Sequence, residues 1–235
     1  MAASAPAKLD YGLEARATVR HMFSRGAWTL AFGIALFLIN RSEYPGPAAH
    51  ILIALGLIGL AFIAVGMVMV RSSRVARFEA RDRILDALAL KGDERVLDVG
   101  CGTGVMLIGV AKRLKSGRVT GLDLSGEAAI AKENAKLEGA GDKVQRIDVV
   151  ETPKFVYPDN YYDAVVSLLA LHHAGESDVR EQLVREMWRV LKPGGRLAIY
   201  DLLRAGEYAE TLRAAGAQSV ELSPMGWART VTAQK

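Results

Sequence analysis

The sequence predicts a doubly wound α/β domain with a mainly parallel sheet, preceded by a helical hairpin long enough to cross a membrane. Three observations support this architecture. Short apolar segments alternate with amphipathic helical segments from about residue 95 onwards, which is the pattern of βαβ units. A glycine-rich turn follows the first of these apolar segments. Two long uncharged stretches, residues 27–39 and 51–70, precede the domain.

Each expected strand is a short apolar run that ends at an acid or a turn. The expected strands lie at about residues 96–99, 118–123, 144–147, 161–168, 196–200, 219–222 and 228–232. Helices are expected at residues 103–114, 126–137 with Ser125 as the N-cap, 178–191 and 207–215. The last two strands flank Pro224-Met225-Gly226, so we expect a hairpin with one antiparallel strand near the sheet edge.

The turn after the first strand has the composition of a nucleotide-binding loop. It reads Gly-Cys-Gly-Thr-Gly at residues 100–104 and follows Asp98. Glycines allow the backbone to approach a ligand closely, and the next helix would point its free N–H groups at that ligand. The glycine spacing differs from a dinucleotide fingerprint, because Val105 stands where the third glycine belongs. Asp98 favours a ligand with an ammonium group, such as S-adenosylmethionine, and a purely structural tight turn is the alternative.

The next two strands also end in acids. Asp123 follows the second strand at a distance that suits both ribose hydroxyls of a bound nucleoside. Asp148 follows the third strand and is placed to receive an adenine amino group, with Leu124 and Val149 covering the faces of the ring. Each acid alone would fit a solvated loop or a helix cap equally well, but three at successive strand ends favour a shared ligand.

These motifs resemble the class I S-adenosylmethionine-dependent methyltransferases of the broad type 11 group. The resemblance runs from about residue 81 to residue 235 and also includes Tyr157–Ser167 and the turn Leu191-Lys192-Pro193-Gly194-Gly195. It implies a Rossmann-like, seven-stranded sheet and S-adenosylmethionine as cofactor, with S-adenosylhomocysteine as product. The implied cofactor-binding residues are Asp98, Gly100, Cys101, Gly102, Thr103, Gly104, Asp123, Leu124, Asp148, Val149 and Leu168. No metal site is assigned.

Two histidines follow the fourth strand, at the rim where this group commonly carries one or two. Methyl transfer is an in-line displacement at an activated carbon, so positioning and desolvation can supply most of the rate. If the acceptor must lose a proton, His172 or His173 is the best available base; otherwise they are structural. Only about six residues, Asp201 to Gly206, separate the fifth strand from the next helix, so we expect the acceptor side to lack a lid.

The first seventy residues predict a membrane hairpin. Residues 50–70 are long enough to span a hydrocarbon core, whereas residues 27–40 form a shorter segment with Trp28 and Tyr44 as interfacial anchors. Pro45-Gly46-Pro47 breaks the chain between them. Basic residues precede and follow the pair, and the loop holds only Arg41, so both ends and the catalytic domain are predicted to face the cytoplasm.

Charge distribution argues against a nucleic-acid substrate. Residues 1–83 hold 10 of the 30 Lys and Arg and 5 of the 26 Asp and Glu, which leaves the domain with 20 basic and 21 acidic residues. The arginines of residues 71–83 suit anionic lipid headgroups or simply set the topology. Gly56, Gly59 and Gly66 would allow a homo-oligomer through the hairpin. Cys101 is the only cysteine, which excludes an intramolecular disulfide and agrees with a reducing compartment.

The expected organisation is a cytoplasmic segment at 1–26, a membrane hairpin at 27–70, a basic linker helix at 71–90 and a methyltransferase domain at 91–235. We expect a membrane-anchored methyltransferase whose acceptor is a small lipophilic molecule: a quinone or isoprenoid, a phospholipid amine, or a hydrophobic thiol or phenol. The alternatives are a membrane scaffold that binds the cofactor without catalysis and an NAD-dependent oxidoreductase.

Overall fold

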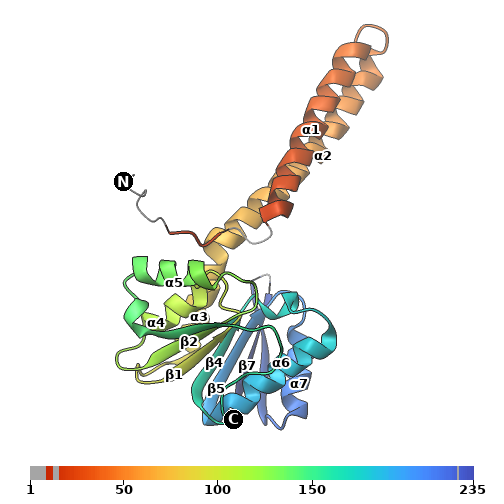
Figure 1. Ribbon diagram of the computed structural model, residues 1–235. Coiled ribbons are helices and arrows are strands. Elements are labelled where there is room, and N and C mark those ends of the chain that lie inside the picture. Colours follow the sequence, from red (N-terminus) through yellow and green to blue (C-terminus); the bar gives the residue numbers. More distant parts are fainter. Residues whose placement is uncertain (1–8, 13–15, 227) are drawn as a thin grey trace, which may run out of the picture. The chain divides into compact units, whose positions relative to one another are not determined.

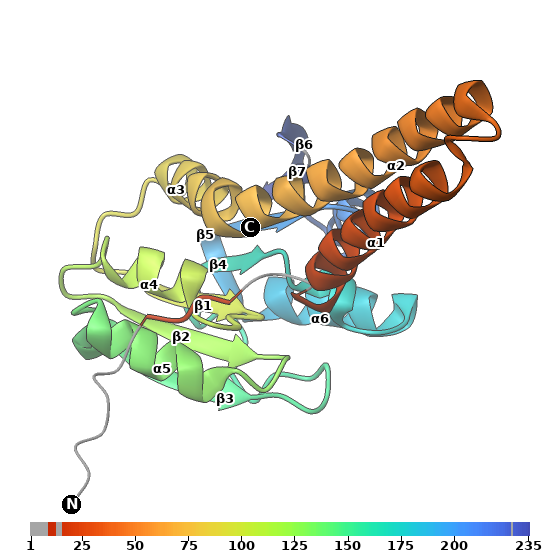
Figure 2. The ribbon, with the colours of Figure 1, turned by 90° about the horizontal axis from the view of Figure 1, so that it is seen from above.

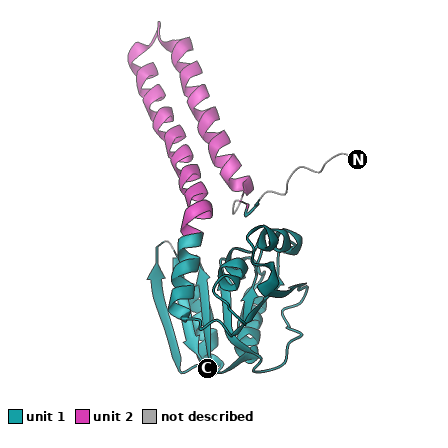
Figure 3. Ribbon diagram, turned by 90° about the vertical axis from the view of Figure 1, so that its left-hand side faces the viewer, with its two compact units in different colours: residues 1–11, 78–235 teal, residues 12–77 magenta. Residues whose placement is uncertain are grey.

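The computed structural model describes residues 9–12, 16–226 and 228–235, which fall into two compact units (Figure 3). Unit 1 contains residues 9–11 together with Phe78–Lys235, and unit 2 is Gly12–Arg77. Two segments therefore differ from the expected organisation. Residues 78–90, expected as part of a linker helix, belong to unit 1, and so do residues 9–11 of the expected cytoplasmic segment.

Unit 1 is built on a seven-stranded sheet in the order β3-β2-β1-β4-β5-β7-β6. Its strands are β1 (Arg95–Val99), β2 (Arg118–Asp123), β3 (Val144–Val149), β4 (Tyr162–Leu168), β5 (Leu191–Asp201), β6 (Ser219–Met225) and β7 (Ala228–Gln234). The pairs among β1 to β5 are parallel, and β7 lies antiparallel between β5 and β6. This confirms the predicted doubly wound fold with one antiparallel strand beside the edge.

Helices cover both faces of the sheet (Figure 1). One face packs against α3 (Arg77–Leu88), α4 (Val105–Ala111) and α5 (Ala128–Leu137), and the other against α6 (Ser177–Val190) and α7 (Ala205–Ala214). In α3, four side chains are buried against the sheet, namely Ala80, Ile84, Leu85 and Leu88. Because these residues complete the core, the helix expected as a membrane linker is a structural part of the domain.

Several element bounds differ from the expected ones. β5 begins at Leu191 and so includes the segment expected as a turn, and β6 extends to Met225. α4 spans only seven residues, because Gly104 at its N-cap has a φ of +93° and the helix gives way to a turn after Ala111. β3 continues through Asp148 and Val149, since Val149 pairs with Asp123. Ser125 is not the cap of α5, where the N-cap is Glu127.

Unit 2 is a helical hairpin made of α1 (Arg16–Asn40) and α2 (Pro45–Arg71), followed by the π-helical turn Ser72–Ala76. α1 begins earlier than expected, and Pro45 starts α2 because its fixed φ suits the first turn of a helix. Both helices are long and apolar enough to cross a membrane, with mean hydropathies of 1.6 and 2.8, and only 11% of each apolar window is buried.

Glycines set the close approach of the two helices. A Cβ at Gly26 would lie 2.9 Å from the carbonyl oxygen of Gly59, and a Cβ at Gly59 would lie 3.0 Å from that of Gly26. Gly33 and Gly66 lie seven residues further along α1 and α2 and are buried in the same way. This seven-residue spacing is the repeat of helices that pack side by side along one seam. A Cβ at Gly56 would meet no described atom within 4 Å, so Gly56 lies outside this seam.

We predict that Gly59→Ala destabilises the hairpin whereas Gly56→Ala does not. A methyl group at Gly59 would meet Leu30 at 2.7 Å, and such overpacking costs about 1–3 kcal/mol. At Gly56 the methyl group meets nothing, and alanine is favoured over glycine in a helix by roughly 0.5–1 kcal/mol. Thermal loss of helical circular dichroism in detergent measures both variants. Equal melting of the two would contradict the glycine seam.

Candidate functional site

The predicted site residues lie at the carboxyl ends of the parallel strands β1 to β4. β1 lies between β2 and β4, and the chain winds outward from it in both directions, so the carboxyl ends of β1 and β4 form a topological switch point. Ligands of open α/β sheets bind at such points. The glycine turn follows β1, Asp123 is the last residue of β2, and Leu168 is the last residue of β4. Leu124 and His172 lie in the loops that follow β2 and β4.

The turn after β1 is held by the neighbouring strand and by the loop after β4. The backbone N–H groups of Gly100 and Cys101 both donate to the carbonyl oxygen of Leu122, at 2.7 and 2.9 Å. Gly100 has a φ of +75°, and a Cβ on it would overlap the Cβ of Ala170. Glycine is therefore required at this position for both conformation and space.

Asp98 lies in β1, two residues before Gly100, and its carboxyl group is fully buried. Neither of its oxygens has a hydrogen bond of good geometry from a described residue, although the backbone N–H of Leu107 lies near enough to offset part of the effect of burial on its pKa. Burial raises the pKa of Asp98 to about 8. Burial, followed by the charges of Asp98 and Asp123, also raises the pKa of the Cys101 thiol. The turn thus combines an unreactive thiol with a neighbouring carboxyl group that burial keeps mainly protonated near neutral pH.

Asp123 organises the turn after β2. One of its oxygens accepts hydrogen bonds from the backbone N–H and the hydroxyl of Ser125, at 2.9 and 3.0 Å. The other accepts from the N–H of Ala128 at 2.6 Å, which is the first residue of α5. Asp123 therefore performs the capping that was expected of Ser125, while its two carboxylate oxygens retain further acceptor capacity.

Asp148 and Val149 lie at the end of β3. Asp148 accepts hydrogen bonds from Arg146 at 2.8 Å and from the hydroxyl of Tyr157 at 2.5 Å, so its carboxylate is held by neighbouring side chains. Val149 is 62% exposed and presents an apolar surface. Leu124 and Leu168 are half-buried and pack against the two cores. These four residues form an apolar and acidic margin to the glycine turn.

Thr103 differs from the other residues of the turn, because its polar groups contact the N-terminal segment and α5. Its hydroxyl donates to the carbonyl oxygen of Tyr11 at 3.1 Å, and its carbonyl oxygen accepts from the side chain of Asn134 at 2.9 Å. Tyr11 and Asn134 were not predicted as site residues. They lie far from the turn in sequence, and no local pattern links the three residues.

His172 is fixed by a buried acid at the end of β5. Its Nδ1 lies 3.1 Å from Asp201, and its backbone N–H donates to the same oxygen at 3.2 Å. Asp201 also accepts from the hydroxyl of Tyr208 at 3.1 Å and from the N–H of Leu203 at 3.0 Å. Burial opposes its ionisation, yet the hydrogen bonds from these groups, that of His172 foremost, hold the pKa of Asp201 below its usual value. The roles of Asp201 and Tyr208 were not predicted.

His173 is the less constrained of the two histidines. Its ring lies 3.9 Å from that of His172, centre to centre, and its side chain is exposed. Burial and the neighbouring His172 lower the pKa of His173. His172 is thus held by a carboxylate, whereas the ring of His173 lies tilted against the ring of His172.

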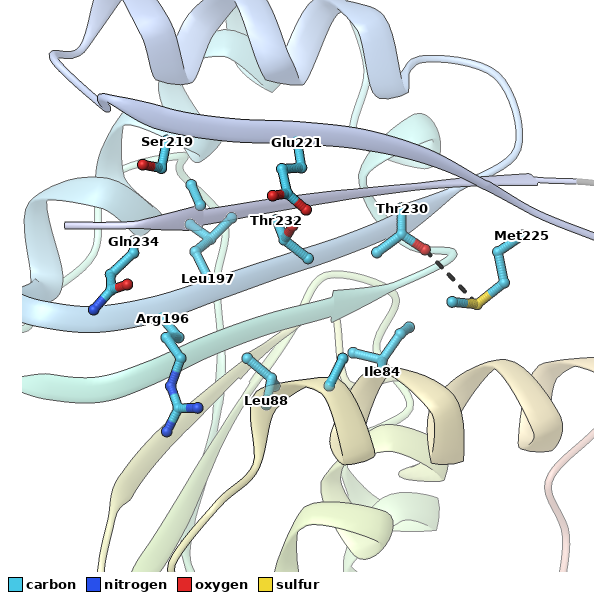
Figure 4. A pocket seen from close by; sticks show the side chains of 12 residues that line it. Ile84, Leu88, Arg196, Leu197, Ser219, Glu221, Met225, Thr230, Thr232 and Gln234 are labelled. Carbon is cyan, nitrogen blue, oxygen red and sulfur yellow. Dashed lines mark hydrogen bonds between the residues drawn. The ribbon is translucent and has the colours of Figure 1, made fainter.

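A separate hollow lies between α3 and the strands β5, β7 and β6 (Figure 4). It encloses about 300 Å³ and is lined by the apolar side chains of Ile84, Leu88 and Met225 together with Thr230, Thr232 and Arg196. The hydroxyl of Thr230 points to the sulfur of Met225 at 3.7 Å. None of the predicted site residues lines this hollow.

Comparison with known proteins identifies the domain that carries the site. Residues 96–195 match the family model described as a methyltransferase domain. The chain carries a methyltransferase domain. This match includes the glycine turn, the ends of β2, β3 and β4, and the two histidines.

Individual relatives extend the likeness over the methyltransferase domain. The 27-O-demethylrifamycin SV methyltransferase of Amycolatopsis mediterranei is 37% identical over 52% of this chain and 43% of its own. A ubiquinone/menaquinone biosynthesis C-methyltransferase of Chromobacterium violaceum is 32% identical over 50% of this chain and 46% of its own. The matches therefore span less than half the length of these relatives. The crystal structure of a SAM-dependent methyltransferase from Aquifex aeolicus is 26% identical, with a TM-score of 0.54, over 65% of this chain and 88% of that one.

We predict that Gly100→Ala unfolds the methyltransferase domain more readily than Gly126→Ala. Both glycines have a positive φ, of +75° and +82°, so alanine is strained at either position by roughly 1 kcal/mol or more. Only at Gly100 does the added methyl group also collide with Ala170, which adds about 1–3 kcal/mol, because Gly126 has no described atom within 4 Å. Urea denaturation followed by Trp fluorescence compares the two, and a larger loss at Gly126 would refute the packing argument.

Proposed function

We propose that the chain is a membrane-anchored, S-adenosylmethionine-dependent methyltransferase that methylates a small lipophilic acceptor. The observation that carries the cofactor assignment is the fully buried Asp98 carboxyl next to the glycine turn, which has no hydrogen bond of good geometry from any described residue. A positively charged ligand in the turn stabilises the ionised form of such a group, whereas an anionic ligand repels it.

The surroundings of the turn support a cationic cofactor over a dinucleotide. Asp98 and Asp123 both lie close enough to Cys101 to act on its thiol, and a cation bound in the turn would favour the ionised form of each carboxyl group. These features disfavour the NAD-dependent oxidoreductase and suit the sulfonium and ammonium of S-adenosylmethionine.

The residues at the strand ends fit the parts of this cofactor. The turn at residues 100–104 would hold the methionine portion, and the remaining acceptor capacity of Asp123 would serve the ribose hydroxyls. Asp148 would meet the adenine amino group beside the exposed Val149. When bound, the cofactor supplies a methyl carbon made electrophilic by its sulfonium.

His172 is the residue best placed to accept a proton from the acceptor. Asp201 accepts the Nδ1–H of His172, which selects the tautomer with an unprotonated Nε2. The same carboxylate stabilises the imidazolium that forms when Nε2 takes up a proton. His173 has no carboxylate within hydrogen-bonding distance in the described part of the chain, so we assign the base to His172 and not to His173.

The hairpin supports the membrane anchor. Most of its large apolar side chains are exposed, including Phe32, Ile39, Ile53, Leu57 and Leu60, and such a surface favours a lipid environment. The basic residues on both sides of the hairpin would place the methyltransferase domain in the cytoplasm and next to anionic headgroups. A lipophilic acceptor is further supported by the short β5–α7 connection and by the quinone-pathway relative.

We predict that cofactor binding expels a proton from Asp98. The pKa of about 8 means that the carboxyl group is mainly protonated at pH 7, and a bound cation lowers that pKa. Affinity for S-adenosylmethionine should therefore rise between pH 6 and pH 8, with release of up to about one proton at pH 7. Isothermal titration calorimetry in buffers of different ionisation enthalpy counts the protons. Asp98→Asn should remove this Asp98 contribution, and equal proton release by the variant would refute the role.

Turnover by the full chain can be measured in detergent with methyl-labelled cofactor and a native lipid extract. Label should enter a lipid-soluble product, and His172→Ala should lower that turnover by about 10²–10⁴-fold without changing cofactor affinity. His173→Ala is the matched control and should retain most activity.

The outcomes separate the alternatives. Cofactor binding without any labelled product would favour the non-catalytic scaffold. Label found only in water-soluble product would refute the lipophilic acceptor, and equal losses from both histidine variants would refute the assignment to His172.

A further inference from the structure

We propose that residues 9–11 form a strap that holds the cofactor turn, and that Asn134 is the positioning residue that joins the strap to the turn. The inference rests on the proposed function in one respect, since it takes the turn after β1 as the cofactor site. Figure 2 shows the strap in red, passing between α4 and α5.

The side-chain amide of Asn134 connects the strap with the turn through three hydrogen bonds. Its side-chain oxygen accepts the backbone N–H of Asp10 at 3.0 Å. Its side-chain nitrogen donates to the carbonyl oxygen of Asp10 at 2.8 Å and to that of Thr103 at 2.9 Å. The side chain is 1% exposed, so these bonds form away from water, where losing one is costly.

Tyr11 adds a second connection between the strap and the turn. Its carbonyl oxygen accepts the hydroxyl of Thr103 at 3.1 Å, and its own hydroxyl donates to Glu138 at the end of α5, also at 3.1 Å. Its ring meets the ring of Phe78 edge-on, with the centres 5.2 Å apart. The strap is therefore held at three places, by the turn, by α5 and by the start of the domain's first helix.

The hydroxyl of Thr103 is engaged by the strap and its carbonyl oxygen by Asn134. Thr103 lies between Gly102 and Gly104, which both have a positive φ. Because glycine restricts the backbone less than any other residue, the turn has little rigidity of its own. The strap would then supply the rigidity that the glycines lack, so that the turn is ordered before the cofactor arrives.

This role also gives the segment before the hairpin a function. The strap precedes unit 2 in the chain and Phe78 follows it, and the two meet through the Tyr11 and Phe78 rings. A change in the strap should therefore alter cofactor affinity, even though the strap contributes no predicted cofactor contact.

The only cysteine of the chain offers a direct reporter. Cys101 lies in the turn and is buried, so a thiol reagent reaches it only when the turn opens. The rate of Cys101 alkylation in the full chain, solubilised in detergent and without cofactor, measures that opening. The dissociation constant of S-adenosylhomocysteine is measured on the same preparations.

Two variants weaken the connection between the strap and the turn, one by a change on α5 and the other by a change on the strap itself. Asn134→Leu removes all three hydrogen bonds, and Asp10→Pro removes the N–H that Asn134 accepts while leaving Asn134 itself in place. We expect each to speed alkylation and to weaken S-adenosylhomocysteine binding, by about tenfold for Asn134→Leu and less for Asp10→Pro. The double variant should be no worse than Asn134→Leu alone, because both changes break one connection.

Glu133→Gln on the exposed side of α5 is the matched control, and it should change neither quantity by more than about twofold. If Asn134→Leu lowers the melting temperature, Asp10→Pro decides, because it leaves the helix intact. Unchanged alkylation in Asp10→Pro would overturn the strap. If the wild-type chain binds no S-adenosylhomocysteine, the proposed function fails, while the alkylation rates still test the strap independently.

Discussion

The close approach of two loops at the centre of the sheet is the constraint on which the site depends. The turn after β1 and the loop after β4 touch at Gly100 and Ala170, where no second Cβ would fit. His172 follows Ala170 by two residues, so this contact sets the separation between the glycine turn and the histidine. Leu169, which precedes Ala170, has a φ of +53°, and its N–H bonds to Tyr200 on β5. The surrounding sheet thus holds a residue in a conformation that it would not adopt alone.

The same site carries a stability cost. The pKa of Asp98 in the folded chain lies well above its usual value of 3.8, so the contribution of this group to stability is greatest below that value and is lost as the pH rises towards 8. At neutral pH the folded domain holds a carboxyl group that would ionise readily if unfolded. A cation bound in the turn would stabilise the ionised carboxylate of Asp98 and offset this cost. The group that destabilises the unliganded domain would then also select cationic over anionic ligands.

Local features of this structure could be predicted from the sequence, whereas contacts between residues far apart along the chain could not. Strand and helix positions depend on local periodicity, and the glycine turn depends on five consecutive residues, so both could be predicted. The contacts of Asp201 with His172 and of Asn134 with Asp10 join residues 29 and 124 positions apart, and neither leaves a local pattern. The seam of Gly26 and Gly59 was missed for the same reason, because its partners lie on different helices.

The hairpin and the active site make complementary demands on their surroundings. Within the hairpin, the glycines of each helix pack against the backbone and side chains of the other helix, and the exposed apolar side chains, such as Phe32 and Leu57, remain outside that seam. Exposure of these side chains to water is unfavourable, which supports the proposed membrane environment of the hairpin. The methyltransferase domain has a short β5–α7 connection where a covering segment would otherwise stand. A chain kept at a lipid surface by its hairpin would meet a lipophilic acceptor there, and the strap would keep the cofactor turn ordered while the acceptor side stays open.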